Sequence, residues 1–443
     1  MKTYLNFLIF CATLNLSNCF ANDLTLQEAV ELAFKNDRGW RIAESKNLEA
    51  QEYVPRALSQ LLPSLSLNLN SNQVNQQLTT GLVVSPEQKY PSQSQFINLR
   101  QPLLISKQLE NLNLARHQEL QAGFFKLDES QQLLVRVVSA YFDAVSERTK
   151  FDLVQSQRKE LESKSTASVS SLKAGQASQI DVAEVNVQLE ISKSNELKLE
   201  QSFKLAMKQL ENIVGIKISK IDNKDLDIQK FIFLSPEPLH VCIEKYFSGS
   251  PKIQIQRREI EIAEANLSVA IKGHLPTLDL VAQVGRSSGE NSYFTNTKND
   301  NKFIGVQLNV PLYSGGATQS QIRTYVAKLE QAKEQYELTA DSLKTQIQKE
   351  HDTLTYNLRL VAALDLALKS AEQILVSNKK GVAAGTKSTL DVLQAENQRL
   401  EVSMNFTQAQ HESMKAWTRL MSILGENNQE KITSLYQNII RIN

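Results

Sequence analysis

Two long stretches of the chain lack proline, and one of them also lacks glycine, and no other feature constrains the fold as strongly. Residues 317–380 contain neither glycine nor proline, and no proline lies between Pro102 and Pro236. Such stretches permit helices far longer than the average of about 11–12 residues. An uninterrupted run of about 65 residues extends roughly 95 Å as a helix. No single-core domain is that deep, so we expect long helices that form a rod or a tube.

A short motif occurs twice, each time between two long helical patterns, so each copy is expected to form the tip of a helical hairpin. Both copies read Ala-Gly-x-x-Ser-x-x-Asp-Val, over 174–182 and over 384–392. Further segments repeat in the same order and at nearly the same separation: Leu62-Pro63-Ser64-Leu65 with Leu275-Pro276-Thr277-Leu278, and Pro102-Leu103 with Pro311-Leu312. Ordered matches of this kind indicate an internal duplication rather than a solenoid of short repeats. We predict a first structural repeat over 22–237, a second over 238–425, and a polar C-terminal tail over 426–443.

Each repeat also contains an alternating segment that is typical of strands. Leu65, Leu67 and Leu69 alternate with polar residues in the first repeat, and Leu278 and Leu280 do so in the second. A period of two gives a strand one apolar face. We expect two strands per repeat, each of about 9–10 residues, a length that crosses a bilayer when tilted. The strands of each pair are separated by polar loops over 71–95 and 285–302.

Four strands per chain limit the possible architectures. Four strands cannot close into a barrel. An open sheet edge does not occur in lipid, because its backbone N–H and C=O groups would lack partners. If the strands span a membrane, several chains must therefore share one barrel. The alternative is a soluble four-stranded sheet packed on helices.

The N-terminus resembles a secretory signal peptide over 1–21. Lys2 supplies a positive charge, residues 4–16 are largely apolar, and Cys19-Phe20-Ala21 has small residues at the −3 and −1 positions of a cleavage site. Leu16-Ser17-Asn18-Cys19 also resembles a lipobox, so lipidation of Cys19 is the alternative to its removal. In both cases the chain leaves the cytoplasm, and Cys242 remains without an intrachain disulfide partner.

The sequence contains no constellation that indicates catalysis or a cofactor. The five histidines share no ligand spacing, and no phosphate-binding loop is present. The formal net charge of +1 gives no pull toward nucleic acid. We interpret Cys242 as a packed side chain, and His351 with Asp352 as a solvated or interhelical pair. We therefore predict no enzyme activity, no metal, no cofactor and no nucleic-acid partner.

Several motifs together resemble the TolC-type outer-membrane efflux proteins, over nearly the whole mature chain. The segments that carry the resemblance are Leu26-Gln27-Glu28-Ala29-Val30, Leu62-Pro63-Ser64-Leu65, Gln101-Pro102-Leu103, Val310-Pro311-Leu312-Tyr313-Ser314-Gly315-Gly316 and the motif over 384–393. The resemblance implies a mainly α-helical fold with a small β part. Long coiled-coil helices would form a trimeric periplasmic tunnel, and four strands per chain would be pooled into a shared twelve-stranded barrel.

The same resemblance implies a function in export. Such proteins are passive exit ducts of tripartite systems, and they dock a periplasmic adaptor and an inner-membrane RND or ABC transporter. We therefore expect a homotrimer in outer-membrane lipid, with a large periplasmic part, that conducts drugs, small molecules or secreted proteins. The sequence does not decide between these cargoes. The alternative function is a periplasmic coiled-coil adaptor or structural rod, although no compact β-rich module is visible between the two halves.

The two motif copies have a structural interpretation that explains both. Gly175 and Gly385 suit the left-handed position that closes a helix. Ser178 and Ser388 suit the N-cap of the next helix. An aspartate follows each serine three residues later and completes a capping box.

The resemblance adds a functional interpretation of the second motif. Asp391 matches an acidic residue that forms a ring at the periplasmic constriction, where charged rings attract cations. Gln394 stands where a second acidic residue is often found. Lys387 matches a basic residue that bonds between neighbouring coils, Asp181 matches its partner in the other repeat, and Val382 replaces a tyrosine of this gate. We therefore expect a single acidic ring and a closed state held by fewer or different bonds.

Overall fold

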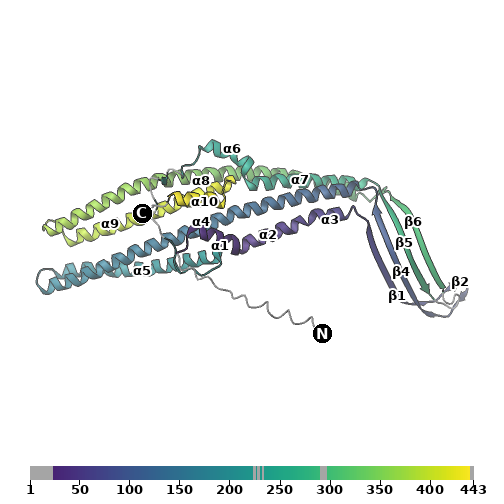
Figure 1. The fold of residues 1–443 in the computed structure, drawn as a ribbon, viewed down its shortest axis with the longest axis horizontal. Coiled ribbons are helices and arrows are strands. Elements are labelled where there is room, and N and C mark those ends of the chain that lie inside the picture. The colour runs from purple at the N-terminus through teal and green to yellow at the C-terminus, as the bar shows by residue number, and fades with distance from the viewer. Residues whose placement is uncertain (1–22, 223–225, 227–229, 232–233, 290–296, 440–443) are drawn as a thin grey trace, which may run out of the picture.

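A computed structural model describes residues 23–222, 226, 230–231, 234–289 and 297–439. The predicted signal peptide, and with it the processing of Cys19, lies outside these residues. Figure 1 shows an elongated molecule in which long helices run side by side along most of its length. A four-stranded sheet continues from one end of the helices and bends away from their axis.

Two helical hairpins make up most of the length. Helix α4 (Ser106–Lys173) turns into α5 (Gln179–Val214), and α8 (Ala317–Ala383) turns into α9 (Thr389–Leu424). With 68 and 67 residues, α4 and α8 each extend roughly 100 Å, which confirms the predicted long helices. Neither contains a proline, so the hydrogen-bond ladder is uninterrupted from the sheet to the turn. None of the described helices is both long enough and apolar enough to span a bilayer.

Shorter helices lie beside the long ones on the side toward the sheet (Figure 1). In the first half these are α1 (Leu26–Asn36), α2 (Arg38–Gln51) and α3 (Tyr53–Ser59), which pack along α4. In the second half they are α6 (Leu239–Gly249), α7 (Pro251–Ile271) and the 3-10 turn η2 (Lys272–His274). Helix α7 packs against both α4 and α8, so it joins the two halves near the sheet.

The sheet is antiparallel throughout and has the strand order β1-β4-β5-β6. Its strands are β1 (Ser64–Gln76), β4 (Gln88–Pro102), β5 (Thr277–Gly289) and β6 (Thr297–Asn309). They contain 13 or 15 residues, so the predicted shorter strands are wrong. Most of the predicted loop over 71–95 and the described parts of the predicted loop over 285–302 also lie in strands or in a small hairpin. The ladder continues beyond the apolar alternation because backbone pairing needs no apolar side chain. A small hairpin of β2 (Thr79–Thr80) and β3 (Val83–Val84) was also not predicted.

The two faces of the sheet differ in chemistry. One face, here called the apolar face, carries Leu65, Leu67, Leu69, Ile97, Leu99, Leu280, Ala282, Val284, Ile304, Val306 and Leu308. Leu67 and Ile304 on this face are 62% and 75% exposed. The opposite face, here called the polar face, carries mainly serine, asparagine and glutamine. An exposed apolar surface this extensive marks a face that meets lipid or another protein.

The largest packed core lies midway along the helices, where α1, α4, α9 and α10 (Gln429–Ile439) meet. Tyr141 of α4 is fully buried, and its hydroxyl donates to the carbonyl oxygen of Asp222 at 3.1 Å. The hydroxyl of Tyr436 lies 3.5 Å from that of Tyr141. Helix α10 buries Ile432, Tyr436 and Ile439, so the segment read as a polar tail contributes an amphipathic helix to the core.

A glycine ends the shorter arm of each hairpin where that arm meets another helix. Gly215 and Gly425 are left-handed, with φ of 77° and 73°. A Cβ at Gly215 would press against Asn36, whose amide donates to the carbonyl of Val214 at 2.8 Å. A Cβ at Gly425 would overlap the backbone carbonyl of Gly249 at the end of α6. Both repeats therefore use a glycine to bring two helix ends into contact.

Replacing Gly425 by alanine is expected to destabilise the helical region. Gly425→Ala adds left-handed strain of about 1–2 kcal/mol, and the overlap with Gly249 adds ~1–3 kcal/mol. Gly385→Ala is the matched control, because its φ is also 73° and no atom lies within 4 Å of the added Cβ. Thermal unfolding followed by circular dichroism should show the larger drop in midpoint for Gly425→Ala. Equal drops would contradict the role assigned to this contact.

Candidate functional site

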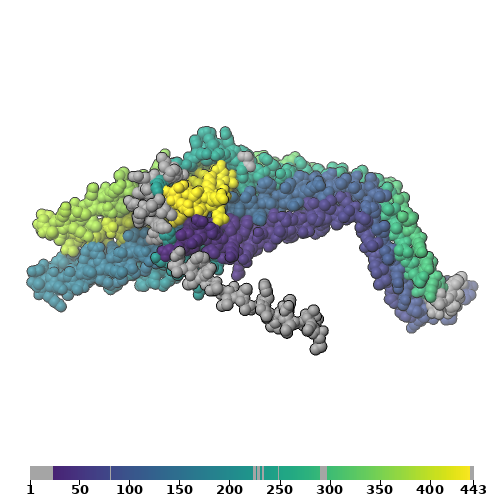
Figure 2. Space-filling view, in the orientation of Figure 1, coloured from purple at the N-terminus to yellow at the C-terminus, as the bar shows by residue number. Residues whose placement is uncertain are grey.

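The two hairpin turns lie at the same end of the molecule, opposite the sheet (Figure 1). The first joins α4 to α5, and the second joins α8 to α9. The repeated motif of the sequence occupies both turns. We call these turns the first tip (174–182) and the second tip (384–392). The space-filling view in Figure 2 shows that the two hairpins end as separate projections.

In the first tip, a glycine ends α4 and a reciprocal side-chain cap begins α5. Gly175 follows the C-cap residue Ala174 at the end of α4, with φ of 72°. The Ser178 hydroxyl accepts a hydrogen bond from the backbone N–H of Asp181 at 3.1 Å. The Asp181 carboxylate in turn accepts from the backbone N–H and the hydroxyl of Ser178, both at 2.9 Å. This arrangement satisfies backbone donors that the start of a helix would otherwise leave unpaired.

The second tip repeats the arrangement. Gly385 has φ of 73°. The Ser388 hydroxyl accepts from the backbone N–H of Asp391 at 3.2 Å. The Asp391 carboxylate accepts from the Ser388 backbone N–H at 2.8 Å and from its hydroxyl at 2.9 Å. The same residue types at the same spacing therefore build the same turn in both halves.

These caps also determine the charge state of the two aspartates. The backbone N–H of Ser178, followed by its hydroxyl, lowers the pKa of Asp181 from its usual value. The equivalent groups of Ser388, with a smaller contribution from Lys387, lower the pKa of Asp391. Hydrogen bonds to a carboxylate favour its charged form. Each tip therefore carries a fixed negative charge at neutral pH.

Lys387 pairs within its own tip. Its Nζ lies 3.7 Å from Oδ1 of Asp391, one helical turn away. Asp181 is engaged in the cap of the first tip, and the contacts described for this single chain do not bring Lys387 to it. Gln394 is exposed on α9, and Val382 is partly exposed at the end of α8. The structure thus brings together Lys387 and Asp391, and it leaves Asp181 in the neighbouring tip.

A cluster of four charged residues, which the sequence did not reveal, links the two hairpins just behind the tips. Lys379 of α8 lies 3.1 Å from Glu396 of α9 and 3.4 Å from Glu160 of α4. Lys164 of α4 lies 3.4 Å from Glu160 and also contacts Glu396. Burial opposes ionisation of Glu160, but Lys164, a hydrogen bond with Glu396 and Lys379 together outweigh it and lower its pKa. We call these four residues the interhairpin cluster.

Packing and amide contacts accompany the interhairpin cluster. A buried apolar group of Leu161, Val185, Leu189 and Leu393 joins α4, α5 and α9. The Gln157 amide donates to Asn397 at 2.7 Å, and the Asn397 amide donates to Gln188 at 3.1 Å. Glu396 is 7% exposed, so its carboxylate depends on the two lysines for compensation. Sequence spacing could not identify the contacts between the hairpins, such as Lys164 with Glu396 and Lys379 with Glu160, because their members lie in different repeats.

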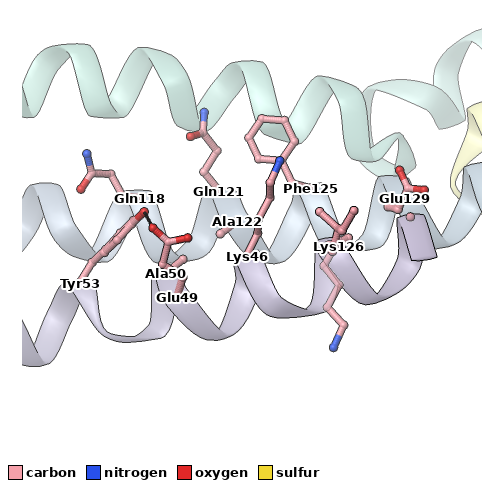
Figure 3. A pocket seen from close by; sticks show the side chains of 13 residues that line it. Lys46, Glu49, Ala50, Tyr53, Gln118, Gln121, Ala122, Phe125, Lys126 and Glu129 are labelled. Carbon is pink, nitrogen blue, oxygen red and sulfur yellow. Dashed lines mark hydrogen bonds between the residues drawn. The ribbon is translucent and has the colours of Figure 1, made fainter. Parts of the chain in front are cut away.

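A groove lies elsewhere, between α2 and α4 (Figure 3). Its volume is about 600 Å³, and Lys46, Tyr53 and Phe125 are among the side chains that line it. Phe125 is 53% exposed and Ile42 is 57% exposed. The lining mixes single charges with exposed apolar groups and assembles no catalytic constellation. The groove is an open helix face rather than an enclosed site.

The other residues singled out in the sequence, Cys242 and His351, are buried or make local contacts and form no reactive site. Cys242 is buried, and burial raises the pKa of its thiol. Nε2 of His351 lies 3.2 Å from the Glu237 carbonyl oxygen, and its Nδ1 lies 3.5 Å from Asp352. Within the part of the chain that the structure describes, no three or more potential metal ligands cluster.

Comparison with known proteins gives consistent matches over most of the chain. The family model described as "Outer membrane efflux protein" matches residues 30–216 and 243–426. The proteases secretion protein PrtF of Dickeya chrysanthemi is 26% identical over 96% of this chain and 94% of its own length. The alkaline protease secretion protein AprF of Pseudomonas aeruginosa is 25% identical over 94% and 88%. The crystal structure of the outer membrane protein VceC of Vibrio cholerae has a TM-score of 0.75 at 17% identity, over 90% and 96%.

Neutralising Glu396 is expected to loosen the contact between the hairpins. Glu396→Gln leaves Lys164 and Lys379 without their shared, buried counterion, and breaking such a pair costs about 1–3 kcal/mol when the lysines are partly exposed. Hydrogen exchange of the backbone around the second tip should therefore become faster. Glu401→Gln, an exposed position on the same helix, is the matched control. Unchanged exchange in Glu396→Gln would show that the cluster does not hold the hairpins together.

Proposed function

The chain belongs to the outer membrane efflux protein family, and on this premise we propose that it is the exit duct of a protein-exporting assembly. As a member of this family it is an outer-membrane channel with a large periplasmic part. The observation that carries the proposal is the sheet, which exposes one apolar face and stands at the end of helices of roughly 100 Å. The sheet meets the lipid, and the helices cross the periplasm toward a transporter.

The unit of function in this proposal is a homotrimer. Strands β1 and β6 are the two open edges of the sheet, and open edges are not stable in lipid. Three copies bring twelve strands together, enough to close a barrel, whereas one copy cannot. The exposed apolar side chains of the α2–α4 groove, Ile42 and Phe125, are then covered by the neighbouring chain, because exposed patches of this kind mark interfaces.

The inside of the proposed barrel is polar and nearly uncharged. On the polar face, Arg100 and Asp279 form an ion pair at 2.7 Å near the helices. They are the only charged residues of that face in the four described strands. Amide and hydroxyl side chains make up most of the rest, as in the hydrogen bond from Asn70 to Ser94. Amide and hydroxyl groups of this kind can exchange hydrogen bonds with a polar chain as water does, and the few charges would not hold the chain in place. Such a wall suits passive conduction of a polar chain. We propose no catalytic step.

The cargo proposed here is a secreted protein, delivered by a periplasmic adaptor and an inner-membrane transporter of the ABC class. PrtF and AprF, whose names describe protease secretion, are matched over nearly the whole chain, and this supports the choice. Drug efflux through an RND-class transporter is the second candidate. It is supported by the toluene efflux pump outer membrane protein TtgF of Pseudomonas putida, which is 23% identical over 92% of this chain. The tips are the proposed docking end for the adaptor, being the end farthest from the sheet.

Membrane fractionation tests the proposed duct directly. The full-length protein should be recovered with the outer membrane, migrate differently on gels before and after heating, and conduct ions in planar bilayers. Crosslinkers placed at the tips should capture an adaptor and its transporter. Recovery as a soluble periplasmic protein without conductance would instead support the adaptor or structural-rod function.

The tips are the proposed gate. In a trimer, three copies of Asp391 converge into an acidic ring with Gln394 beside it, and Lys387 reaches Asp181 of an adjacent coil. The lowered pKa of Asp391 keeps the ring charged, and a ring of carboxylates selects cations. The interhairpin cluster holds each hairpin pair in the closed arrangement. Opening requires the second hairpin to move away from the first.

Reversing a gate charge is expected to make the closed duct leak. Lys387→Glu and Asp181→Lys each replace an attraction between coils by repulsion, so the resting conductance in planar bilayers should rise severalfold. Lys333→Glu, an exposed position on α8 far from the tips, is the control for the charge change alone. Unchanged conductance in both gate variants would remove Lys387 from the gate.

Removing the acidic ring is expected to weaken block by multivalent cations. Asp391→Ala deletes three carboxylates from the constriction, so the cation concentration that halves the conductance should rise severalfold. Ser388→Ala serves as the control, because it removes the hydroxyl of the cap but keeps the carboxylate. Equal block of Asp391→Ala and the unaltered protein would place Asp391 away from the constriction.

A further inference from the structure

The apolar face of the sheet ends in basic side chains on the side away from the helices. Pairing across the strands groups this face into rows, and one fully apolar row consists of Leu65, Leu99, Ala282 and Ile304. One row further from the helices, Lys302 stands beside Val284. Arg286 and Lys298 follow on the same face, and all three bases are exposed. We call Arg286, Lys298 and Lys302 the basic border.

Acidic compensation at the basic border is partial. On the described residues of β5 and β6, Asp300 is the single acid of this face. It is held by Arg286 through two hydrogen bonds of 2.6 and 3.0 Å. Lys298 and Lys302 flank that pair along β6. On the neighbouring strand β4, Lys89 is a further base of this face, and the Glu87 carboxylate just before that strand accepts a hydrogen bond from the Asn75 amide. The border therefore carries an excess of positive charge at the end of an apolar surface.

The basic border occupies the level at which membrane strands commonly carry aromatic residues. The aromatic residues of the four described strands are Tyr90, Phe96 and Phe303, and all three lie on the polar face. Lysine can lay its hydrocarbon stem along an apolar surface and place its ammonium in the polar layer. Lys302 is paired with Val284 across the strands, so its hydrocarbon stem can pack along the apolar face in this way.

We propose that the basic border binds the phosphate groups of lipid in the outer leaflet of the outer membrane. This inference rests on the outer-membrane duct proposed above, which places the far end of the strands at the outer surface. The group next to the end of a lipid-covered face is the lipid headgroup, and lysine and arginine are strong partners for phosphate. Each base near an anionic membrane surface strengthens attraction about fivefold. The apolar face and the basic border thus match the two parts of one phosphorylated lipid.

The test compares phosphorylated and dephosphorylated forms of the same glycolipid. Purified full-length protein in nonionic detergent is mixed with lipid A carrying two phosphates, or with its dephosphorylated form, and bound lipid is measured by native mass spectrometry. The unaltered protein should retain the phosphorylated form preferentially. A Lys298→Gln, Lys302→Gln double variant should bind it about twenty-five-fold more weakly. Lys333→Gln with Lys349→Gln, two exposed lysines of α8, is the control of equal charge change.

The possible outcomes separate this inference from the proposed function. Equal binding of the two lipid forms, equal loss in the control variant, or unchanged binding in the double variant would each overturn it. Displacement of the lipid by inorganic phosphate at equal concentration would also overturn it, by indicating a free-anion site. Planar-bilayer conductance of the same preparations is expected to be equal for all variants. A protein that conducts but shows no phosphate preference refutes only the basic border, whereas absence of conductance in the unaltered protein refutes the duct.

Discussion

The need to pair every backbone group of the sheet underlies the rest of this structure. A four-stranded antiparallel sheet leaves β1 and β6 open, and its apolar face is exposed over most of its side chains. In water, such a sheet would associate through its edges. In lipid, it must be closed by further copies of the chain. In the proposed trimer, the same hydrogen bonds therefore link assembly to membrane insertion, and they place the long helices around a common axis.

At the other end, the capping of two helices and the chemistry of the proposed gate depend on the same atoms. Asp391 accepts hydrogen bonds from Ser388 to begin α9, and those bonds lower its pKa. A structural cap and a charged ring are therefore compatible roles, since the first secures the ionised state that the second requires. Asp181 has an equal cap, so the duplicated motif supplies a fixed negative charge to each tip. The two tips differ at one position of the motif, where the second tip has Lys387 and the first has Ala177.

Local patterns predicted the long helices, the glycine turns and the caps because each depends on residues only a few positions apart. The strand lengths were underestimated. Strand β1 continues through Asn72 and Gln73, where the sequence no longer alternates between apolar and polar residues and therefore gives no sign of a strand. The packing of α10 was missed for a related reason. Its three buried residues, Ile432, Tyr436 and Ile439, are spaced at helical intervals in a segment otherwise rich in polar residues. Their role became clear only from the structure, which packs them into the aromatic core around Tyr141.

The sequence by itself determined the duplication, the breaker-free helices, the one-sided strands and the repeated tip, because periodicity, glycine placement and capping are encoded locally. The tertiary structure decided which distant residues meet. It placed Glu396 between Lys164 and Lys379, kept Lys387 beside Asp391 rather than Asp181, and aligned Arg286, Lys298 and Lys302 on one face. Those contacts depend on strand register and on how two separately encoded hairpins pack, and spacing along one chain does not specify either.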